Sequence, residues 1–248
     1  MIKKILVSQP RPMTERNPYA DMQHRYGVEF DFHQLIHLEG LDVHEFRLQR
    51  INPLDYTAVL LTSRLAVDHY FRMCEEMRLQ VPESMHYYCI SEAVANYLQK
   101  YIQYRKRRVF FSENNRFEDL LPTMNRRPSE RYLMVSSDVH NNDSVINMLA
   151  SNGITVKPAV MYRTVASEWP NDKPFDYDMI VLFTPTGVAS VKKNFPDWKQ
   201  GETVVACFGL NTIAAAEEEN WKVDIKAPTP ECPSITTAIE RYLEQHLS

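Results

Sequence analysis

The chain repeats one arrangement along its length: a short apolar run, a turn of small hydroxyl or amide residues, and a stretch with helical periodicity. The two most similar copies lie at 58–67 and 180–188, where AVLLTSRLAV is matched by IVLFTPTGV roughly 120 residues later. Strands that alternate with helices predict parallel sheets covered on both faces. Because the repeat is so long, it indicates a duplicated domain rather than a solenoid. We therefore predict an α/β fold of two doubly wound parallel-sheet domains that are pseudo-duplicates.

Apolar runs of strand length between polar turns predict strands at 4–7, 28–32, 56–61, 87–90, 109–111, 131–135, 154–156, 178–183 and 204–208. Apolar residues at helical spacing predict helices at 20–26, 66–77, 93–101, 143–150, 188–195, 213–220 and 234–246. Gly27 and Gly153 follow two of these helices, and glycine is a common residue at a helix end.

Composition and charge exclude several classes of protein. The 248 residues are 44% hydrophobic and 24% charged, with a formal net charge of -4, which argues against a dedicated nucleic-acid surface. No apolar run is long enough to span a bilayer, and Ser8-Gln9-Pro10 interrupts the basic, apolar start before it resembles a signal peptide. The four cysteines form no C-x-x-C motif, so we expect free, buried thiols and a cytoplasmic protein without membrane contact.

Nucleotide and metal motifs are missing from the sequence. The six glycines stand alone, so neither G-x-G-x-x-G nor G-x-x-x-x-G-K-[ST] occurs, which excludes the two commonest nucleotide-binding loops as motifs. The eight histidines include no H-E-x-x-H. We predict no metal site.

Small hydroxyl and amide residues follow most of the predicted strands. They are Ser8-Gln9, Thr62-Ser63, Ser91, Ser136-Ser137, Thr184-Pro185-Thr186 and Asn211-Thr212. Each turn is placed to cap the next helix, and in open α/β sheets these strand ends line the ligand crevice. Helix starts offer unpaired N–H groups and a positive dipole end, so two domains facing one another predict a cleft for a polyanionic, carboxylate-bearing ligand. The alternative is helix capping with no role in binding.

The order and spacing of five short segments are similar to those of a known family. The segments are LTSRLAV at 61–67, VMYRT at 160–164, FTPTGV at 183–188, FGLNTIA at 208–214 and APTP at 227–230. They resemble the patterns T-S-[RP]-x-A-V, V-Y-x-T, F-[ST]-P-S-G-V, I-G-x-x-T-A and A-x-x-P-T of the uroporphyrinogen-III synthases. The resemblance covers nearly the whole chain.

The resemblance implies discontinuous domains, whereas the repeat alone suggests two sequential halves. Residues 1–36 and 167–248 would form one domain and residues 39–164 the other. A two-strand hinge near 37–38 and 165–166 would join them and permit closure around a substrate.

The resemblance also implies an activity, that of a cyclising hydro-lyase of haem biosynthesis. The substrate is hydroxymethylbilane, a linear tetrapyrrole with acetate and propionate on every ring. Loss of the terminal hydroxyl as water gives an azafulvene cation, the last ring attacks it through its substituted carbon, and the spirocyclic intermediate fragments and recloses with that ring inverted. The family uses no metal and no organic cofactor. Hydroxymethylbilane synthase is the expected transient partner, and the expected state is a monomer.

The match to the family assigns roles to particular residues. Tyr162 matches the family's tyrosine and would donate a hydrogen bond to the departing hydroxyl; its alternative role is packing at the hinge. Thr212 would bind a carboxylate through its hydroxyl and backbone N–H, or act only as a helix cap. Further candidates for substrate binding are Thr62, Ser63, Arg64, Ser91, Thr184, Thr186, Gly209 and Asn211.

Two arginines that the family pattern contains are absent. Ser8-Gln9-Pro10 stands in place of T-R-P, and Ser136-Ser137-Asp138 in place of an arginine–glycine pair; the first-half G-x-x-T-A segment is also altered to Ser91-Glu92-Ala93-Val94-Ala95. The candidates to replace the arginines are Arg64, Arg163 and the basic run 105–108. The altered contacts leave two rivals open: a non-catalytic, hinged binder of a small polyanion, and a diverged paralogue without synthase activity.

Overall fold

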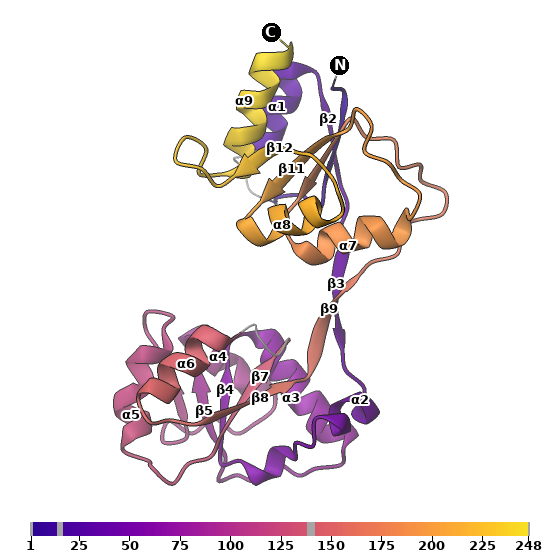
Figure 1. Ribbon diagram of the computed structural model, residues 1–248. Helices are drawn as coiled ribbons and strands as arrows, with labels where there is room; N and C mark the ends of the chain where they lie inside the picture. Colours follow the sequence, from indigo (N-terminus) through magenta and orange to yellow (C-terminus); the bar gives the residue numbers. More distant parts are fainter. Residues whose placement is uncertain (1, 14–16, 138–141, 248) are drawn as a thin grey trace. The chain divides into compact units, whose positions relative to one another are not determined.

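The computed structural model describes residues 2–13, 17–137 and 142–247. The chain divides into two compact units (Figure 1): unit 1 comprises Met1–His37 with Thr164–Ser248, and unit 2 comprises Leu38–Arg163. Each unit contains a five-stranded sheet in which every neighbouring pair of strands is parallel. The predicted α/β fold with two doubly wound parallel sheets is therefore confirmed.

Unit 1 is built from chain segments at both ends of the sequence. Its strands are β1 (Lys4–Val7), β2 (Glu29–Phe32), β10 (Met179–Leu182), β11 (Val204–Phe208) and β12 (Val223–Ala227), in the order β12-β11-β10-β1-β2. Its helices are α1 (Pro18–Tyr26), α7 (Pro185–Asn194), α8 (Leu210–Glu218) and α9 (Ile235–Leu247).

Unit 2 is continuous in sequence. Its sheet runs β6-β5-β4-β7-β8, with β4 (Ala58–Leu61), β5 (His86–Cys89), β6 (Val109–Phe111), β7 (Tyr132–Ser136) and β8 (Val156–Val160). Its α-helices are α2 (Val43–Leu48), α3 (Arg64–Glu76), α4 (Glu92–Tyr97), α5 (Leu121–Asn125) and α6 (Asp143–Ser151), with 3-10 turns at Pro53–Asp55, Leu98–Lys100 and Phe117–Leu120.

The two sheets have one topology with different chain starts. In unit 2 the chain enters at β4, moves outward through β5 and β6, and returns to the other side of β4 for β7 and β8. In unit 1 the strands β10, β11 and β12 repeat the first part of this path, while β1 and β2 repeat the second. The similar segments 58–67 and 180–188 are thus the central strand of each sheet with the start of its helix. A third, two-stranded sheet pairs β3 (Ile36–Gly40) with β9 (Tyr162–Ala166).

Burial on both faces explains why the central strands are apolar throughout. All four residues of β4 and all four of β10 are fully buried. Along β1 and β10 the side chains alternate between two apolar clusters, so that Ile5 and Met179 belong to one and Leu6 and Ile180 to the other. Such continuous apolar runs are typical of parallel strands, which carry helices on both faces.

Several predicted boundaries differ from those of the structure. The helices predicted at 188–195 and 213–220 begin three residues earlier, at Pro185 and Leu210. In α7, Pro185 stands at the helix start, where its missing N–H costs nothing. The strand predicted at 154–156 begins only at Val156 and continues to Val160. The apolar pattern predicts none of β3, β9 and β12; only the family resemblance implied two hinge strands, near 37–38 and 165–166. No helix in the described parts of the chain is long and apolar enough to cross a membrane.

Candidate functional site

The strand order of unit 2 marks one place where a ligand site is expected. Strand order reverses between β4 and β7, and open α/β sheets bind ligands beside the carboxyl ends of the strands at such a switch point. Ser63 follows β4, and Ser137 follows β7. The side chains of both form hydrogen bonds with Tyr162, the first residue of β9. Tyr162 therefore lies at the switch point of unit 2.

Tyr162 is held as a neutral phenol. Its side chain is only 7% exposed, and this burial raises the pKa of the phenol above its usual value of 10, although the hydrogen bonds from Ser63 and Ser137 oppose the shift. The ring stacks on the imidazole of His69 in α3, with centroids 4.8 Å apart and planes 15° apart. A neutral phenol has an O–H that can donate a hydrogen bond.

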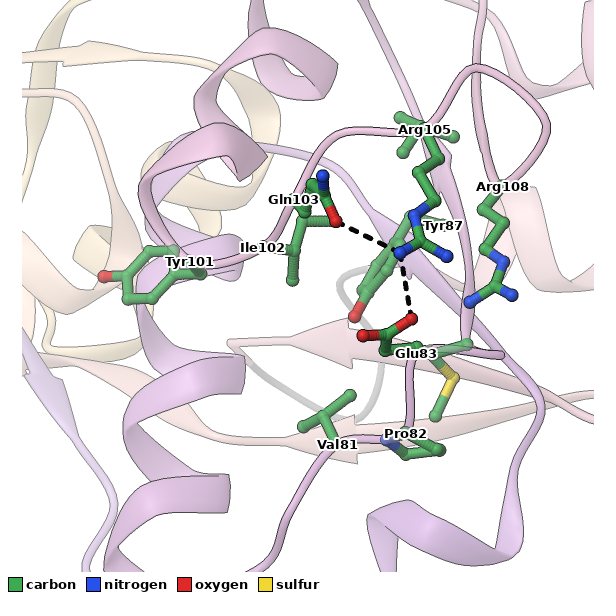
Figure 2. A pocket seen from close by; sticks show the side chains of 11 residues that line it. Val81, Pro82, Glu83, Tyr87, Tyr101, Ile102, Gln103, Arg105 and Arg108 are labelled. Atoms are coloured by element: carbon green, nitrogen blue, oxygen red, sulfur yellow. Dashed lines mark hydrogen bonds and ion pairs between the residues drawn. The ribbon is translucent and has the colours of Figure 1, made fainter.

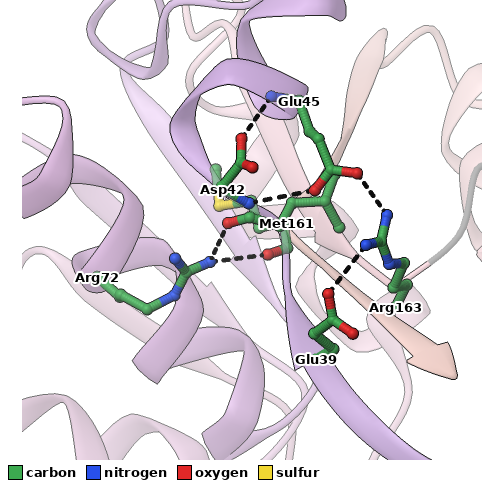
Figure 3. Close-up of polar contacts among 7 residues, drawn as sticks. Glu39, Asp42, Glu45, Arg72, Met161 and Arg163 are labelled. Atoms are coloured by element: carbon green, nitrogen blue, oxygen red, sulfur yellow. Dashed lines mark hydrogen bonds and ion pairs between the residues drawn. The ribbon is translucent and has the colours of Figure 1, made fainter.

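Arg72 of α3 holds the segment that carries Tyr162 (Figure 3). Its Nη2 donates to the backbone oxygens of Leu41 at 2.8 Å and Met161 at 3.1 Å, and Met161 directly precedes Tyr162. Its Nε lies 3.2 Å from His69 Nδ1 and donates to it, while Nη1 pairs with Glu76 at 2.8 Å. Arg72 thus fixes the main chain before Tyr162 and also orients the ring on which Tyr162 stacks.

Arg72 also affects the size of the side chain allowed at position 40 and the charge of His69. A Cβ on Gly40 would lie 2.7 Å from Nη2 of Arg72, so a larger residue at position 40 would displace the guanidinium. Burial and the nearby Arg72 charge lower the pKa of His69 below 6.5, since both disfavour the imidazolium form. With Nδ1 accepting from Arg72, His69 is neutral and carries its proton on Nε2.

The arginines proposed as substitutes for the family residues differ in their surroundings. Arg163 is bound by two carboxylates, Glu45 at 2.6 Å and Glu39 at 2.9 Å, so its charge is already compensated (Figure 3). Arg64 stands at the start of α3, is exposed, and lies 5.6 Å from the ring centre of Tyr97. Within the described residues no ion pair involves Arg64. The charge of Arg64 is therefore uncompensated within the described residues and can pair with an anionic ligand.

Three of the predicted hydroxyl residues cap helices. Ser63 Oγ accepts from the N–H of Ala66 at 3.0 Å, Ser91 Oγ from Val94 at 3.4 Å, and Thr184 Oγ1 from Gly187 at 3.0 Å. These hydroxyls satisfy backbone donors of their own helices, as the capping alternative predicted. Thr62 lies directly before the cap of α3, and Thr186 lies in the first turn of α7; both are half-buried. Asp138 lies outside the described residues.

Helix α8 of unit 1 starts differently. Gly209 is its N-cap, with φ 91° and ψ 142°, and no side chain caps the helix. Asn211 is exposed in the first turn, whereas Thr212 is 2% exposed. The N–H groups of Thr212 and Ile213 both point to the oxygen of Gly209 at 3.1 Å. An uncapped start of this kind leaves N–H donors at the positive end of the helix dipole, where a carboxylate is stabilised.

A comparison with protein families decides the identity of the chain. Residues 25–237 match the family model described as Uroporphyrinogen-III synthase HemD.

The chain belongs to the uroporphyrinogen-III synthase family.

Enzymes of this family are cyclising lyases of haem biosynthesis that act on a tetrapyrrole. The crystal structure of uroporphyrinogen-III synthetase from Helicobacter pylori has the same fold, with a TM-score of 0.55 at 14% identity, covering 99% of this chain and 100% of that one. A mutant synthase from Thermus thermophilus matches with a TM-score of 0.45 at 15% identity over 98% of this chain and 100% of its own. No curated protein sequence matches significantly.

Sequence reasoning missed two residues that hold Tyr162 in place. His69 and Arg72 are three positions apart on α3, a spacing that places them on one helix face, but nothing in the sequence connects that face with Tyr162.

Proposed function

We propose that this chain converts hydroxymethylbilane into uroporphyrinogen III, with Tyr162 as the group that assists loss of the hydroxyl. The observation that carries the proposal is the position of Tyr162. In a chain of the synthase family, a buried phenol stands at the sheet's switch point, in the segment VMYRT that resembles the family pattern V-Y-x-T.

The main task of the protein in this reaction is to position the substrate. The lone pair of the pyrrole nitrogen expels the terminal hydroxyl, and the phenol of Tyr162 donates a proton to the departing oxygen, so that water leaves. The azafulvene cation is attacked by the substituted carbon of the last ring, and the spirocyclic intermediate fragments and recloses. The ring proton released when the last pyrrole regains aromaticity balances the proton given to water. Because the substrate cyclises unaided to the uninverted isomer, the protein must hold one folded pose.

The remaining residues have binding roles in this proposal. Arg64 pairs with a substrate carboxylate in unit 2. The start of α8 binds carboxylates through its free N–H groups and the residues Gly209, Asn211 and Thr212. Ser63, Ser91 and Thr184 act mainly by holding the helix starts in place, and Thr62 and Thr186 lie next to two of these starts as weaker contacts.

The proposal extends to the surroundings of the enzyme. A substrate that cyclises spontaneously favours transient contact with hydroxymethylbilane synthase, which would shorten its time in water. All four cysteines are free and buried, which suits a reducing compartment, and we assign the chain to the cytoplasm as a monomer.

The isomer formed tests this function. Purified hydroxymethylbilane synthase is coupled to this protein, the products are oxidised, and the porphyrin isomers are separated. The proposal predicts isomer III, formed faster than isomer I appears without added protein. Isomer I alone, at the uncatalysed rate, would reject the synthase and favour the non-catalytic binder or the inactive paralogue.

A further inference from the structure

A cavity of about 220 Å³ opens at the edge of unit 2 opposite to the one that holds Tyr162. Its walls come from the segment that leads into β5 and from the segment between α4 and β6 (Figure 2). Tyr87 and Val109, near the amino ends of β5 and β6, form its floor. Because parallel strands all point one way, this edge is separated from the switch-point residues by the length of the sheet.

The walls are mostly apolar, and one charged group inside them lacks a counterion. Val81, Pro82 and Ile102 provide aliphatic surface, and Tyr87 and Tyr101 provide aromatic rings. Such walls remove the apolar body of a ligand from water, while the few polar groups fix its orientation.

Arg105 is already occupied. Its Nη2 donates to Gln103 Oε1 at 3.0 Å and pairs with Glu83 Oε2 at 3.0 Å, which links the two wall segments across the cavity (Figure 2). Glu83 is thereby neutralised and does not repel an anion.

Arg108 is different. It lines the cavity, its Nη1 is buried without a hydrogen-bond acceptor, and no carboxylate among the described residues pairs with it. Because no carboxylate of the described residues compensates its charge, this half-buried guanidinium can pair with an anion in the cavity.

The shape and the charge together define the ligand. We propose that this cavity binds a small organic carboxylate with an apolar body of one ring, its carboxylate paired with Arg108. An apolar cavity of about 150 Å³ holds benzene, so a single ring fits the volume here. The planar guanidinium matches a carboxylate, whereas an inorganic phosphate would leave the apolar walls unfilled. The site is independent of the proposed synthase reaction.

Benzoate is the probe, and binding is measured by NMR on the full-length protein at neutral pH. Benzoate should shift the amide signals of the 81–87 and 101–109 segments and saturate with a Kd on the order of 1 mM. Neutral benzamide should bind at least about 10-fold more weakly. No saturable shift up to about 50 mM benzoate, or shifts confined to other segments, would overturn the proposal.

Two matched variants separate the site from general charge effects. Arg108→Gln should weaken benzoate binding at least about 10-fold, while Arg107→Gln, an exposed neighbour outside the cavity, should leave it within about twofold. Equal losses in both variants would overturn the proposal. If Arg108→Gln does not fold, Val81→Phe tests the same site by filling the cavity, and unchanged benzoate affinity in that variant contradicts the assignment.

Discussion

The two units share one sheet topology but use the ends of their strands differently. In unit 2, the segment that leaves edge strand β8 brings Tyr162 to the switch point, where Ser63 and Ser137 meet it. In unit 1, the segment that leaves the corresponding strand β2 carries His33, whose ring packs 4.4 Å from that of Trp169. The uncapped start of α8 is the notable feature of unit 1. A duplicated fold thus sets where a site lies, while the residues after each strand determine its chemistry.

This comparison suggests a division of roles: unit 2 carries the group proposed to act on the leaving hydroxyl together with the cation Arg64, and unit 1 carries an uncapped helix start suited to carboxylates. The largest expected effect comes from Tyr162→Phe. The variant keeps the ring and its stacking on His69 but removes the O–H, so kcat should fall about 10- to 100-fold with KM and product affinity nearly unchanged. The measurement is the initial rate of uroporphyrinogen III formation at saturating hydroxymethylbilane. Tyr56→Phe, before β4 at the opposite edge of the sheet, is the control and should retain wild-type kcat.

Variants of Arg72 test whether its hydrogen bonds to the main chain hold Tyr162 in position. Arg72→Met removes the donors to the oxygens of Leu41 and Met161, which should lower the free energy of unfolding by about 1–3 kcal/mol and kcat by about 10-fold. Arg72→Lys keeps the charge and should recover part of both losses. Chemical denaturation and steady-state kinetics measure the two effects. A stability loss with unchanged kcat would show that Arg72 supports the fold alone.

Variants of Arg64 and Arg163, two arginines of unit 2, can be compared directly. Arg64→Gln should raise KM about 5- to 10-fold. The variant removes a guanidinium that no protein carboxylate compensates and that is proposed to pair with a substrate carboxylate. Arg163→Gln removes the same charge from a position where Glu39 and Glu45 already bind it, so KM should stay unchanged. Its exposed ion pairs contribute little to stability, because water and salt screen them. A higher KM for Arg163→Gln than for Arg64→Gln would reverse the assignment.

The pH dependence provides the smallest expected effect. Tyr162 acts in its protonated form, and its raised pKa keeps that form present until the pH rises above about 10. The kcat profile should therefore show no alkaline decline from this group between about pH 7 and 9. A decline with a midpoint below about pH 9 that disappears in Tyr162→Phe would contradict the burial argument.

The sequence predicts the fold well because the central strands are buried on both faces and leave an unmistakable apolar pattern. It also locates the hydroxyl turns that cap α3, α4 and α7, since capping depends on neighbours in the chain. Its apolar pattern misses β3, because the residues of this strand are exposed or half-buried, and only the family resemblance implied a hinge strand there. It misses the support from Arg72, because Leu41, Met161 and His69 meet only in three dimensions. The ion pairs that compensate the charge of Arg163 cannot be predicted from the sequence for the same reason.

The rate at saturating substrate tests the division of roles most directly, with Tyr162→Phe compared against Thr212→Val. Valine replaces the hydroxyl at the start of α8 with a methyl group of similar size, so Thr212→Val should need about 3- to 5-fold more hydroxymethylbilane yet reach the wild-type rate. Tyr162→Phe should remain slow at every substrate concentration. The account is contradicted if Tyr162→Phe reaches the wild-type rate at saturation, or if Thr212→Val fails to reach it.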